Sequence, residues 1–284
     1  MRKDEIVGDL ERSYIRDLLE KGERIDGRGL MDGRQIQIIP NVIKKAEGSA
    51  MVKWGETVVL AGVKTQLGTP FPDTPNTGVI TVNVELSPIS SPINESGPPG
   101  PQAVELARVV DRGIRESKVI PMADPKICVI PGKKVWIIFV DIYVLDDGGN
   151  LFDASAFAAM AALANTKLKQ VVIDQDLEEV TKLDETEPLP RRGSVMGLTF
   201  SKTNGVIVYD PNLVEDRVKE ARFSIGVTDQ NVVCSMQKGE SGTFTQSEIE
   251  MILENAQTIA KPLLTKIEEF SQVPEMNEMF RFEF

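Results

Sequence analysis

The sequence predicts an α+β protein of two lobes with a helix at its N-terminus. Each half of the chain contains short apolar or alternating segments separated by glycine and proline, which is the pattern of β-strands, and each half also contains a long helical pattern. An acidic, proline-containing segment, residues 171–190, separates the halves and is typical of a linker. A chain of 284 residues exceeds the commonest size of a single domain and suits two lobes.

The chain contains no histidine, and this absence removes whole classes of chemistry. Serine–histidine–aspartate catalysis, cysteine–histidine catalysis and histidine-based zinc sites all require the missing residue. Any chemistry would therefore use carboxylates, lysine, arginine, hydroxyl groups or an oxygen-bound metal. Cys128 and Cys234 are the only cysteines, and we expect them to be reduced, buried thiols.

Net charge and hydropathy limit the classes of partner that the chain can have. The 43 acidic and 32 basic residues give a net charge of −11, which argues mildly against nucleic acid as a partner of the isolated chain. This balance leaves room for a local basic stripe, and partner chains would change the field. No apolar run approaches the roughly 20 residues of a membrane span, and the charged N-terminus lacks the apolar core of a signal peptide. We expect a cytoplasmic protein with no membrane partner.

The first half begins with helical periodicity and then changes to a period of two. Residues 5–22 predict an amphipathic helix, and a charged glycine-rich loop follows at 24–34. From residue 35 to residue 65 the pattern predicts an antiparallel meander, and a further strand is expected over 78–86. Long proline-rich loops at 68–78 and 87–102 are of a length that is usually functional or interfacial. The apolar positions of the first helix are Ile6, Leu10, Tyr14, Leu18 and Leu19.

The helix expected from residue 102 onward carries a stripe of arginines. Its apolar face contains Ala103, Leu106, Ala107, Val110 and Ile114. Opposite that face, three arginines fall within a narrow sector, so that their guanidinium groups form one ridge: Arg108, Arg112 and Arg115. Such a ridge could follow a phosphate backbone. The alternative is a solvated face whose arginines pair along the helix with Glu105, Asp111 and Glu116.

A long apolar strand at 133–149 leads through the loop 146–150 into a second helix. We expect this helix to span residues 153–170, to be capped by Asp153 and to pack closely on a sheet through its alanines. The glycine-containing loop could present backbone N–H groups to an anion. A phosphate site would also need a basic side chain, and the next residues, Leu151 and Phe152, cannot supply one.

The second half repeats the order of strands followed by a helix. Its last helix is expected over 246–270, and a loop at 238–245 lacks the spacing of a phosphate-binding P-loop. The expected strands are SVMGLTFSK, GVIVYD, ARFSIGVTD and NVVCSMQ. Residues 271–284 are expected to form a tail whose phenylalanines could dock on a partner.

An acidic segment interrupts the strands of the second half. Asp210, Glu215 and Asp216 supply the hard oxygen ligands that divalent metals prefer, but Arg222 stands where a further acid would help. A guanidinium cannot bind a metal and stays charged. The segment is therefore either a metal site that has lost a ligand or an exposed acidic turn with its charges in solvent.

Five segments follow one another along the chain in a recognisable order: RIDGRGLMDGR (24–34), GSAMVKWGETVVLAGVKT (48–65), ELARVVDRGIRES (105–117), VDIYVLDDGGN (140–150) and YDPNLVEDRVKEAR (209–222). Together they resemble the RNase PH superfamily over nearly the whole chain. The resemblance implies a ribosomal-protein-like βαβ first lobe and a second lobe of strands followed by a helix. The N-terminal helix and the loop 68–78 look most like the non-catalytic ring subunit of the archaeal exosome.

The departures from the superfamily pattern support that subunit type. Catalytic members have a second aspartate six residues after the position matched by Asp216, and here that position is Arg222. They also carry an arginine shortly after the DGG motif to hold the attacking phosphate, and here the matching residue is Leu151. The resemblance therefore implies three degenerate catalytic positions, no catalytic residue and no metal or cofactor of the chain's own. Magnesium and phosphate would be used by the catalytic sister subunit.

The resemblance also implies partners and a role. The chain would alternate with a catalytic RNase PH-type subunit in a ring of three heterodimers, beneath RNA-binding cap proteins, and the ring would degrade single-stranded RNA from its 3′ end. Arg108 and Arg112 match positions implied to contact RNA, and Arg115 is added from the stripe. The alternatives are a phosphorolytic exoribonuclease active on its own and a scaffold that never touches RNA. The expected divisions are 1–30 (helical arm and loop), 31–170 (lobe 1), 171–190 (linker), 191–270 (lobe 2) and 271–284 (tail).

Overall fold

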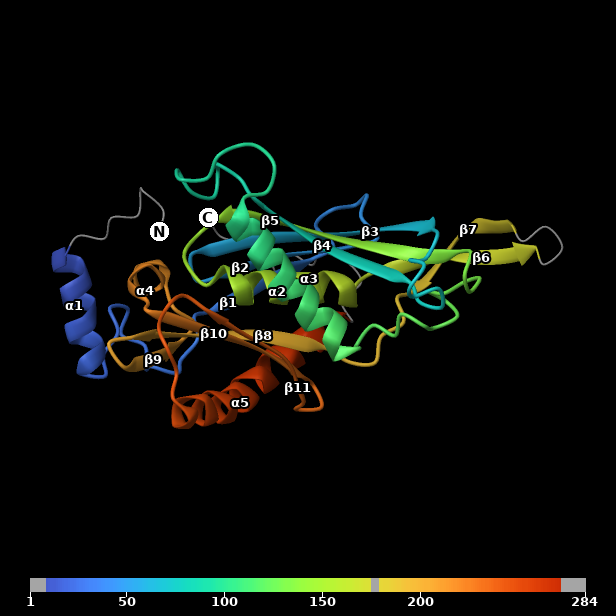
Figure 1. The fold of residues 1–284 in the computed structure, drawn as a ribbon. Coiled ribbons are helices and arrows are strands. Elements are labelled where there is room, and N and C mark those ends of the chain that lie inside the picture. The colour runs from blue at the N-terminus through green and yellow to red at the C-terminus, as the bar shows by residue number, and fades with distance from the viewer. Residues whose placement is uncertain (1–8, 175–178, 272–284) are drawn as a thin grey trace.

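Two β-sheets lie on either side of a helical layer in the computed structural model, which describes residues 9–174 and 179–271 (Figure 1). Helices α2 and α3 form this layer, and α3 packs against β2 and β3 of one sheet and against β8 of the other. The elements are α1 (Asp9–Glu20), β1 (Ile36–Pro40), β2 (Gly48–Trp54), β3 (Thr57–Gly68), β4 (Val79–Leu86), α2 (Pro101–Ser117), β5 (Val135–Asp146), α3 (Leu151–Ala164), β6 (Lys167–Asp174), β7 (Glu179–Pro188), β8 (Val195–Thr203), β9 (Val206–Tyr209), α4 (Leu213–Val218), β10 (Ala221–Thr228), β11 (Val233–Gly239) and α5 (Gln246–Ser271).

The first sheet has the strand order β1-β2-β3-β5-β4. Strands β1, β2 and β3 pair antiparallel, which confirms the predicted meander. Strand β4 pairs parallel with β5 through the crossover helix α2, so the predicted βαβ unit is present. Alternation along β3 buries Val59, Ala61 and Val63, because successive side chains of a strand point to opposite faces.

The second sheet, ordered β11-β10-β8-β9, is antiparallel and contains the four strands expected in the second half. Helix α3 is buried on all sides between the sheets, so it is apolar all round and rich in alanine. Small residues let the layers approach closely. A side chain at Gly48 would place its Cβ 2.5 Å from the carbonyl oxygen of Ala162, so β2 can lie against α3 only with glycine there.

The structure corrects the second predicted helix at both ends. Helix α3 begins at Leu151 after Asn150, which has a left-handed backbone, and ends at Ala164. Asp153 is not the cap, because it lies in the first turn, fully buried, where its carboxylate accepts a hydrogen bond from the backbone N–H of Thr199. The expected continuation to residue 170 was wrong, because residues 167–174 form β6, where β-branched residues favour a strand.

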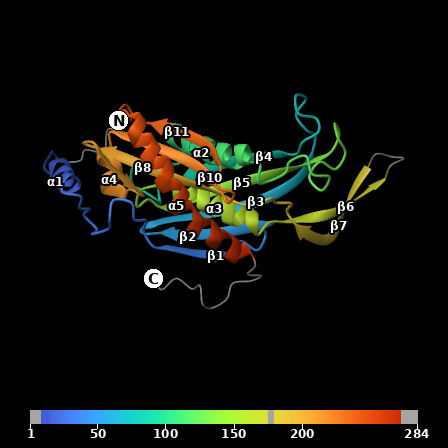
Figure 2. The ribbon, with the colours of Figure 1, turned by 90° about the horizontal axis from the view of Figure 1, so that it is seen from below.

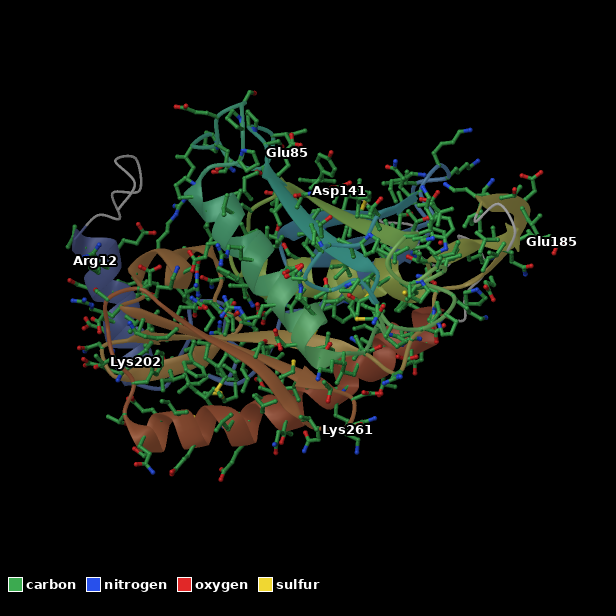
Figure 3. The ribbon with its side chains drawn as sticks, turned by 45° about the vertical axis from the view of Figure 1, so that its right-hand side comes forward. Arg12, Glu85, Asp141, Glu185, Lys202 and Lys261 are labelled. Carbon is green, nitrogen blue, oxygen red and sulfur yellow. The ribbon has the colours of Figure 1, made fainter. Side chains whose placement is uncertain are left out.

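Strands β6 and β7 pair antiparallel, so the segment expected to be a linker is largely an ordered two-stranded sheet. Seen from below, this pair of strands extends from the body at the end opposite α1 (Figure 2). Arg12 on α1 and Glu185 on β7 mark these two ends (Figure 3). Lys182 of β7 lies 5.0 Å from the ring centre of Trp136 and attaches the pair to the first sheet.

Helix α1 packs on the second lobe through fewer apolar residues than the periodicity predicted. Ile15 and Leu19 are buried in a small cluster with Val208 and Val218. Leu10 and Tyr14, which were expected on the packed face, are exposed. Ile6 and the phenylalanine-rich tail lie outside the described residues. Among the residues that the structure describes, no helix is long and apolar enough to cross a membrane.

Candidate functional site

Helix α2 runs between the edge strands β4 and β11 and presents one face to solvent (Figure 1). Pro101 begins the helix, and Lys118 ends it with a left-handed backbone. The apolar face predicted from the sequence is confirmed, because its principal residues are buried against both sheets. These are Ala103, Leu106, Val110 and Ile114.

The opposite face carries the predicted arginine ridge, Arg108, Arg112 and Arg115, and the three side chains have different partners. Arg108 is exposed and has no hydrogen bond or ion pair within the described part of the chain. Arg112 donates from Nη1 to the amide Oε1 of Gln237 on β11, at 3.0 Å. Arg115 donates from Nη2 to Asp111 Oδ1 at 2.9 Å and to the carbonyl oxygen of Ile80 at 3.1 Å.

These contacts test the alternative in which the arginines of the ridge pair with acidic residues of their own helix. Only Arg115 forms such a pair in the described structure, with Asp111 four residues earlier. Glu105 turns away from Arg108 and bonds to Arg222 of β10 instead. The ridge therefore keeps uncompensated positive charge at Arg108 and Arg112.

The acidic segment after β9 is neither an exposed turn nor a group of free carboxylates. Residues 213–218 form the short helix α4, closed by a capping box between Asn212 and Glu215. Glu215 is buried and accepts two hydrogen bonds from Arg24, from Nε at 2.8 Å and from Nη2 at 2.6 Å. Arg24 also donates to the carbonyl oxygens of Tyr209 and Asp210, so it ties the loop 24–34 to the second lobe.

Asp210 is enclosed by donors from the same loop and from Asn150 before α3. Its carboxylate accepts hydrogen bonds from the backbone and guanidinium of Arg34, from Arg28 and from the buried amide of Asn150. Burial would raise the pKa of Asp210, but the hydrogen bonds and charge of Arg34 outweigh burial and hold that pKa below its usual value. The acids thus bind guanidinium groups, and no cluster of three or more potential ligands within residues 9–174 and 179–271 could hold a metal.

The three positions that the resemblance implies to be degenerate, Leu151, Asp216 and Arg222, line one cleft of about 760 Å³. The cleft lies between α1, the start of α2, the start of α3, α4 and the turn after β11, and Arg12 of α1 is among its lining residues (Figure 3). Leu151 and Asp216, which are 65 positions apart in the chain, thus line the same cleft as Arg222.

Arg222 lines this cleft and contacts both an aromatic ring and a carboxylate. Its side chain is only 5% exposed, and its Cζ lies 3.9 Å from the ring centre of Phe152. The same guanidinium donates to Glu105. Leu151 is buried at the first residue of α3, and Asp216 pairs with Lys219 at 2.9 Å. At these three positions, one paired carboxylate thus lies beside an apolar residue and a stacked guanidinium, so they supply neither a second acid nor a guanidinium free to hold phosphate.

Sequence reasoning missed the partners that define these positions. Three such partners lie outside the predicted set: Gln237 contacts Arg112, Phe152 contacts Arg222 and Lys219 contacts Asp216. Arg24 and Arg34 were expected only as part of an ordered loop. The mixture of arginines, acids and glycines in that loop was the available signal for buried ion pairs, because buried charges need partners of opposite charge.

Two family matches cover most of the chain. Residues 32–169 match the 3′ exoribonuclease family, domain 1 (RNase PH), and residues 193–259 match domain 2 of the same family. The chain belongs to the RNase PH family. This family assignment confirms the resemblance and the expected fold of two RNase PH-like lobes.

RNase PH-family proteins of archaeal exosomes are similar to the chain over nearly its full length. It is 49% identical to the exosome complex component Rrp42 of Thermococcus kodakarensis over 256 residues, which cover 90% of this chain and 93% of that protein. It is 46% identical to Rrp42 of Methanothermobacter thermautotrophicus over 249 residues, 88% of this chain and 91% of that protein.

Solved structures give the same assignment. A chain of the Archaeoglobus fulgidus exosome with RNA bound to the active site superposes with a TM-score of 0.82 at 44% identity, covering 91% of this chain and 98% of that one. A chain of an archaeal exosome core superposes with a TM-score of 0.80 at 41% identity, covering 94% of this chain and 100% of that one.

Proposed function

We propose that this RNase PH-family chain is the non-catalytic ring subunit of an archaeal exosome, which degrades RNA phosphorolytically from its 3′ end. The observation that carries the proposal is the cleft in which Leu151 and the Arg222–Phe152 stack occupy the positions where the resemblance implies a phosphate-holding arginine and a second acid in catalytic members. The similarity to Rrp42 proteins supports the same subunit type. The chain would act by completing the active site of a catalytic sister subunit across their interface.

The ridge on α2 supplies the second part of the proposed role. Guanidinium groups that keep their charge bind phosphate oxygens strongly and without reading the base sequence. Arg108 and Arg112 have no acidic partner in the described chain and are the residues expected to hold the RNA backbone. Because the chain carries a net charge of −11, we expect RNA binding by the free chain to be weak and to strengthen in the assembled ring.

The proposal includes the partners and cofactors of the assembly. The ring would contain three heterodimers of this chain and its sister, with RNA-binding cap proteins above it. Magnesium and inorganic phosphate would be used at the sister's active site, since the acids near Asp216 are already paired with cations here.

The test is phosphorolysis of a labelled oligoadenylate with phosphate and magnesium, scored as nucleoside diphosphate released. The purified chain is assayed alone, the sister alone, and the two as a reconstituted ring. We expect no release by the chain alone, and release by the ring above the level of the sister. Clear release by the chain alone would establish instead an exoribonuclease that is active on its own.

A further inference from the structure

The arginines of the α2 ridge differ in the charge of the group that holds them. The partner of Arg112 is the neutral amide of Gln237, and the partner of Arg115 is the carboxylate of Asp111. The Arg115–Asp111 pair has N···O contact at 2.9 Å, and the two side chains are 55% and 24% exposed. Both arginines are thus fixed, but only one of them is neutralised.

This difference determines what each arginine can offer to a phosphate. A guanidinium that donates to an amide oxygen keeps its full positive charge and further N–H donors, while its side chain has already lost rotamer freedom. A guanidinium paired with a carboxylate must give up that pair before it gains a phosphate, and the exchange releases little net free energy. Arg112 is therefore prepared for an anion, and Arg115 is masked.

The position of Gln237 follows from the second sheet. Gln237 lies on the edge strand β11, in register with Ser224 of β10, and faces α2 across the boundary between the lobes. Its own Nε2 donates to the carbonyl oxygen of Lys238 at 3.4 Å, which directs Oε1 toward Arg112. The second lobe thereby fixes a side chain that belongs to the first.

We propose that Gln237 and Asp111 are positioning residues that set which arginines of the ridge grip RNA. Gln237 holds Arg112 in place without cancelling its charge, and Asp111 withholds Arg115 from the RNA backbone. This inference rests on the proposed function, since it assumes that the ridge contacts RNA. It predicts that isosteric changes of the two partners act in opposite directions.

The experiment measures RNA affinity of the reconstituted ring by fluorescence anisotropy over a range of salt concentrations. Gln237→Glu should convert the Arg112 contact into an ion pair, weaken binding and reduce the salt slope by about 0.7, the value for one phosphate contact on a single strand. Asp111→Asn keeps a hydrogen-bond acceptor beside Arg115 but removes the charge, so it should tighten binding and raise the slope by about 0.7.

Matched controls separate local masking from a general change of charge. Gln102→Glu adds one negative charge on the same helix at an exposed residue, and Glu116→Gln removes one from an exposed residue next to Arg115. Neither residue has a hydrogen bond to the ridge in the described structure. We expect each control to change the slope by less than half of the effect of its counterpart. Equal effects of controls and test variants would overturn the inference.

A third variant distinguishes positioning from charge. Gln237→Met removes the acceptor but adds no charge, so Arg112 stays cationic and gains rotamer freedom. We expect about two- to tenfold weaker binding with the salt slope nearly unchanged, because ordering one long side chain must then occur on binding. A purely structural role of Gln237 would instead lower ring stability without this separation of affinity from slope, and that result would contradict the proposal.

The same rings test the underlying function independently. The double variant Arg108→Ala, Arg112→Ala should reduce the slope by about 1.4 for two lost contacts. An unchanged slope in the double variant would refute RNA contact by the ridge itself. A reduced slope in the double variant, with no response to Gln237→Glu or Asp111→Asn, would refute only the role of the partners.

Discussion

The guanidinium of Arg222 stacks on the ring of Phe152, with its Cζ 3.9 Å from the ring centre. Phe152 is the second residue of α3, and Arg222 is the second residue of β10, so the contact joins the two lobes in the lining of the cleft. The Nη2 of the same guanidinium donates to the carboxylate of Glu105, in the first part of α2. Arg222 is thus a structural residue at a position where the resemblance implies an acid in catalytic relatives.

Replacing Arg222 should destabilise the chain through the stack and not through the ion pair. A desolvated cation–π contact contributes about 2 kcal/mol, whereas Glu105 is 45% exposed and an ion pair of this kind contributes at most about 1 kcal/mol. We expect Arg222→Ala to lower the free energy of unfolding by about 2 kcal/mol or more, and Glu105→Gln by less than half as much, in denaturant titrations. Equal losses in the two variants would show that the ion pair dominates.

The buried pair of Arg24 and Glu215 should be far more sensitive than any surface ion pair. Both side chains are almost fully enclosed, at 0% and 1% exposure, and loss of one partner leaves an uncompensated charge in the interior. We expect Arg24→Met to cost about 3–5 kcal/mol of unfolding free energy. The half-exposed pair of Arg16 and Glu220 is the matched control, and Arg16→Met should cost less than about 1 kcal/mol. A loss below about 1 kcal/mol for Arg24→Met would disprove the anchoring role of the loop 24–34.

Periodicity predicted the elements of this fold well because it depends on one face of each element being buried. The strands of the second lobe and the buried face of α2 followed from that pattern, whereas the βαβ unit was expected from the family resemblance. The partners of polar residues did not follow. Arg24 and Glu215 are 191 residues apart, and Arg222 and Glu105 are 117 apart, so only the packing of the lobes brings them together.

The same limit explains two of the differences between the sequence interpretation and the structure. Asp153 has the chemistry of a cap, but the left-handed Asn150 starts the helix earlier and the sheet encloses the carboxylate. Asp210 and Glu215 have the composition of an exposed acidic turn, but guanidinium groups from the loop 24–34 bury and neutralise them. In both cases a distant donor decides the environment of an acid.

Asp153 should make the stability of the chain depend on pH. Burial, and the nearby charge of Asp210, raise the pKa of Asp153 to about 7 from an ordinary value of 3.8. Between these values the folded chain keeps a proton that the unfolded chain releases, so stability falls as pH rises, and the loss is complete above about pH 7. Asn at this position cannot ionise, and its side-chain oxygen can still accept the hydrogen bond from Thr199.

The measurement compares unfolding free energies of the wild type and Asp153→Asn at several pH values. Between about pH 5 and pH 8 the difference should move in favour of the variant by on the order of 2 kcal/mol. Asp17→Asn, on the exposed surface of α1, is the control for loss of one carboxylate. Parallel pH curves for Asp153→Asn and the wild type would exclude a raised pKa at this site.

Magnesium should not stabilise the isolated chain. Asp216 is paired with Lys219, and Asp210 and Glu215 are bound by arginines, so a cation at this place would have to displace ion pairs already formed. A ligand that binds the folded state raises its stability with the logarithm of concentration. We therefore expect the melting temperature to be the same in millimolar Mg²⁺ and in EDTA. A Mg²⁺-dependent rise that disappears in Asp216→Asn would reveal a retained metal site.

The single arginines of the ridge should rank by the charge of their partners. Arg108 has no partner in the described chain, and Arg115 is paired with Asp111. In reconstituted rings, Arg108→Ala should lower the salt slope of RNA binding by about 0.7, because it removes one phosphate contact. Arg115→Ala should change the slope by much less, since the charge that it removes is already compensated.

The two substitutions should have similar effects on folding, because both residues are exposed and lie on one helix. The melting temperature of each ring measures those effects. An equal fall in slope for both variants would mean that the ion pair with Asp111 opens when RNA binds, and that all three arginines follow the backbone.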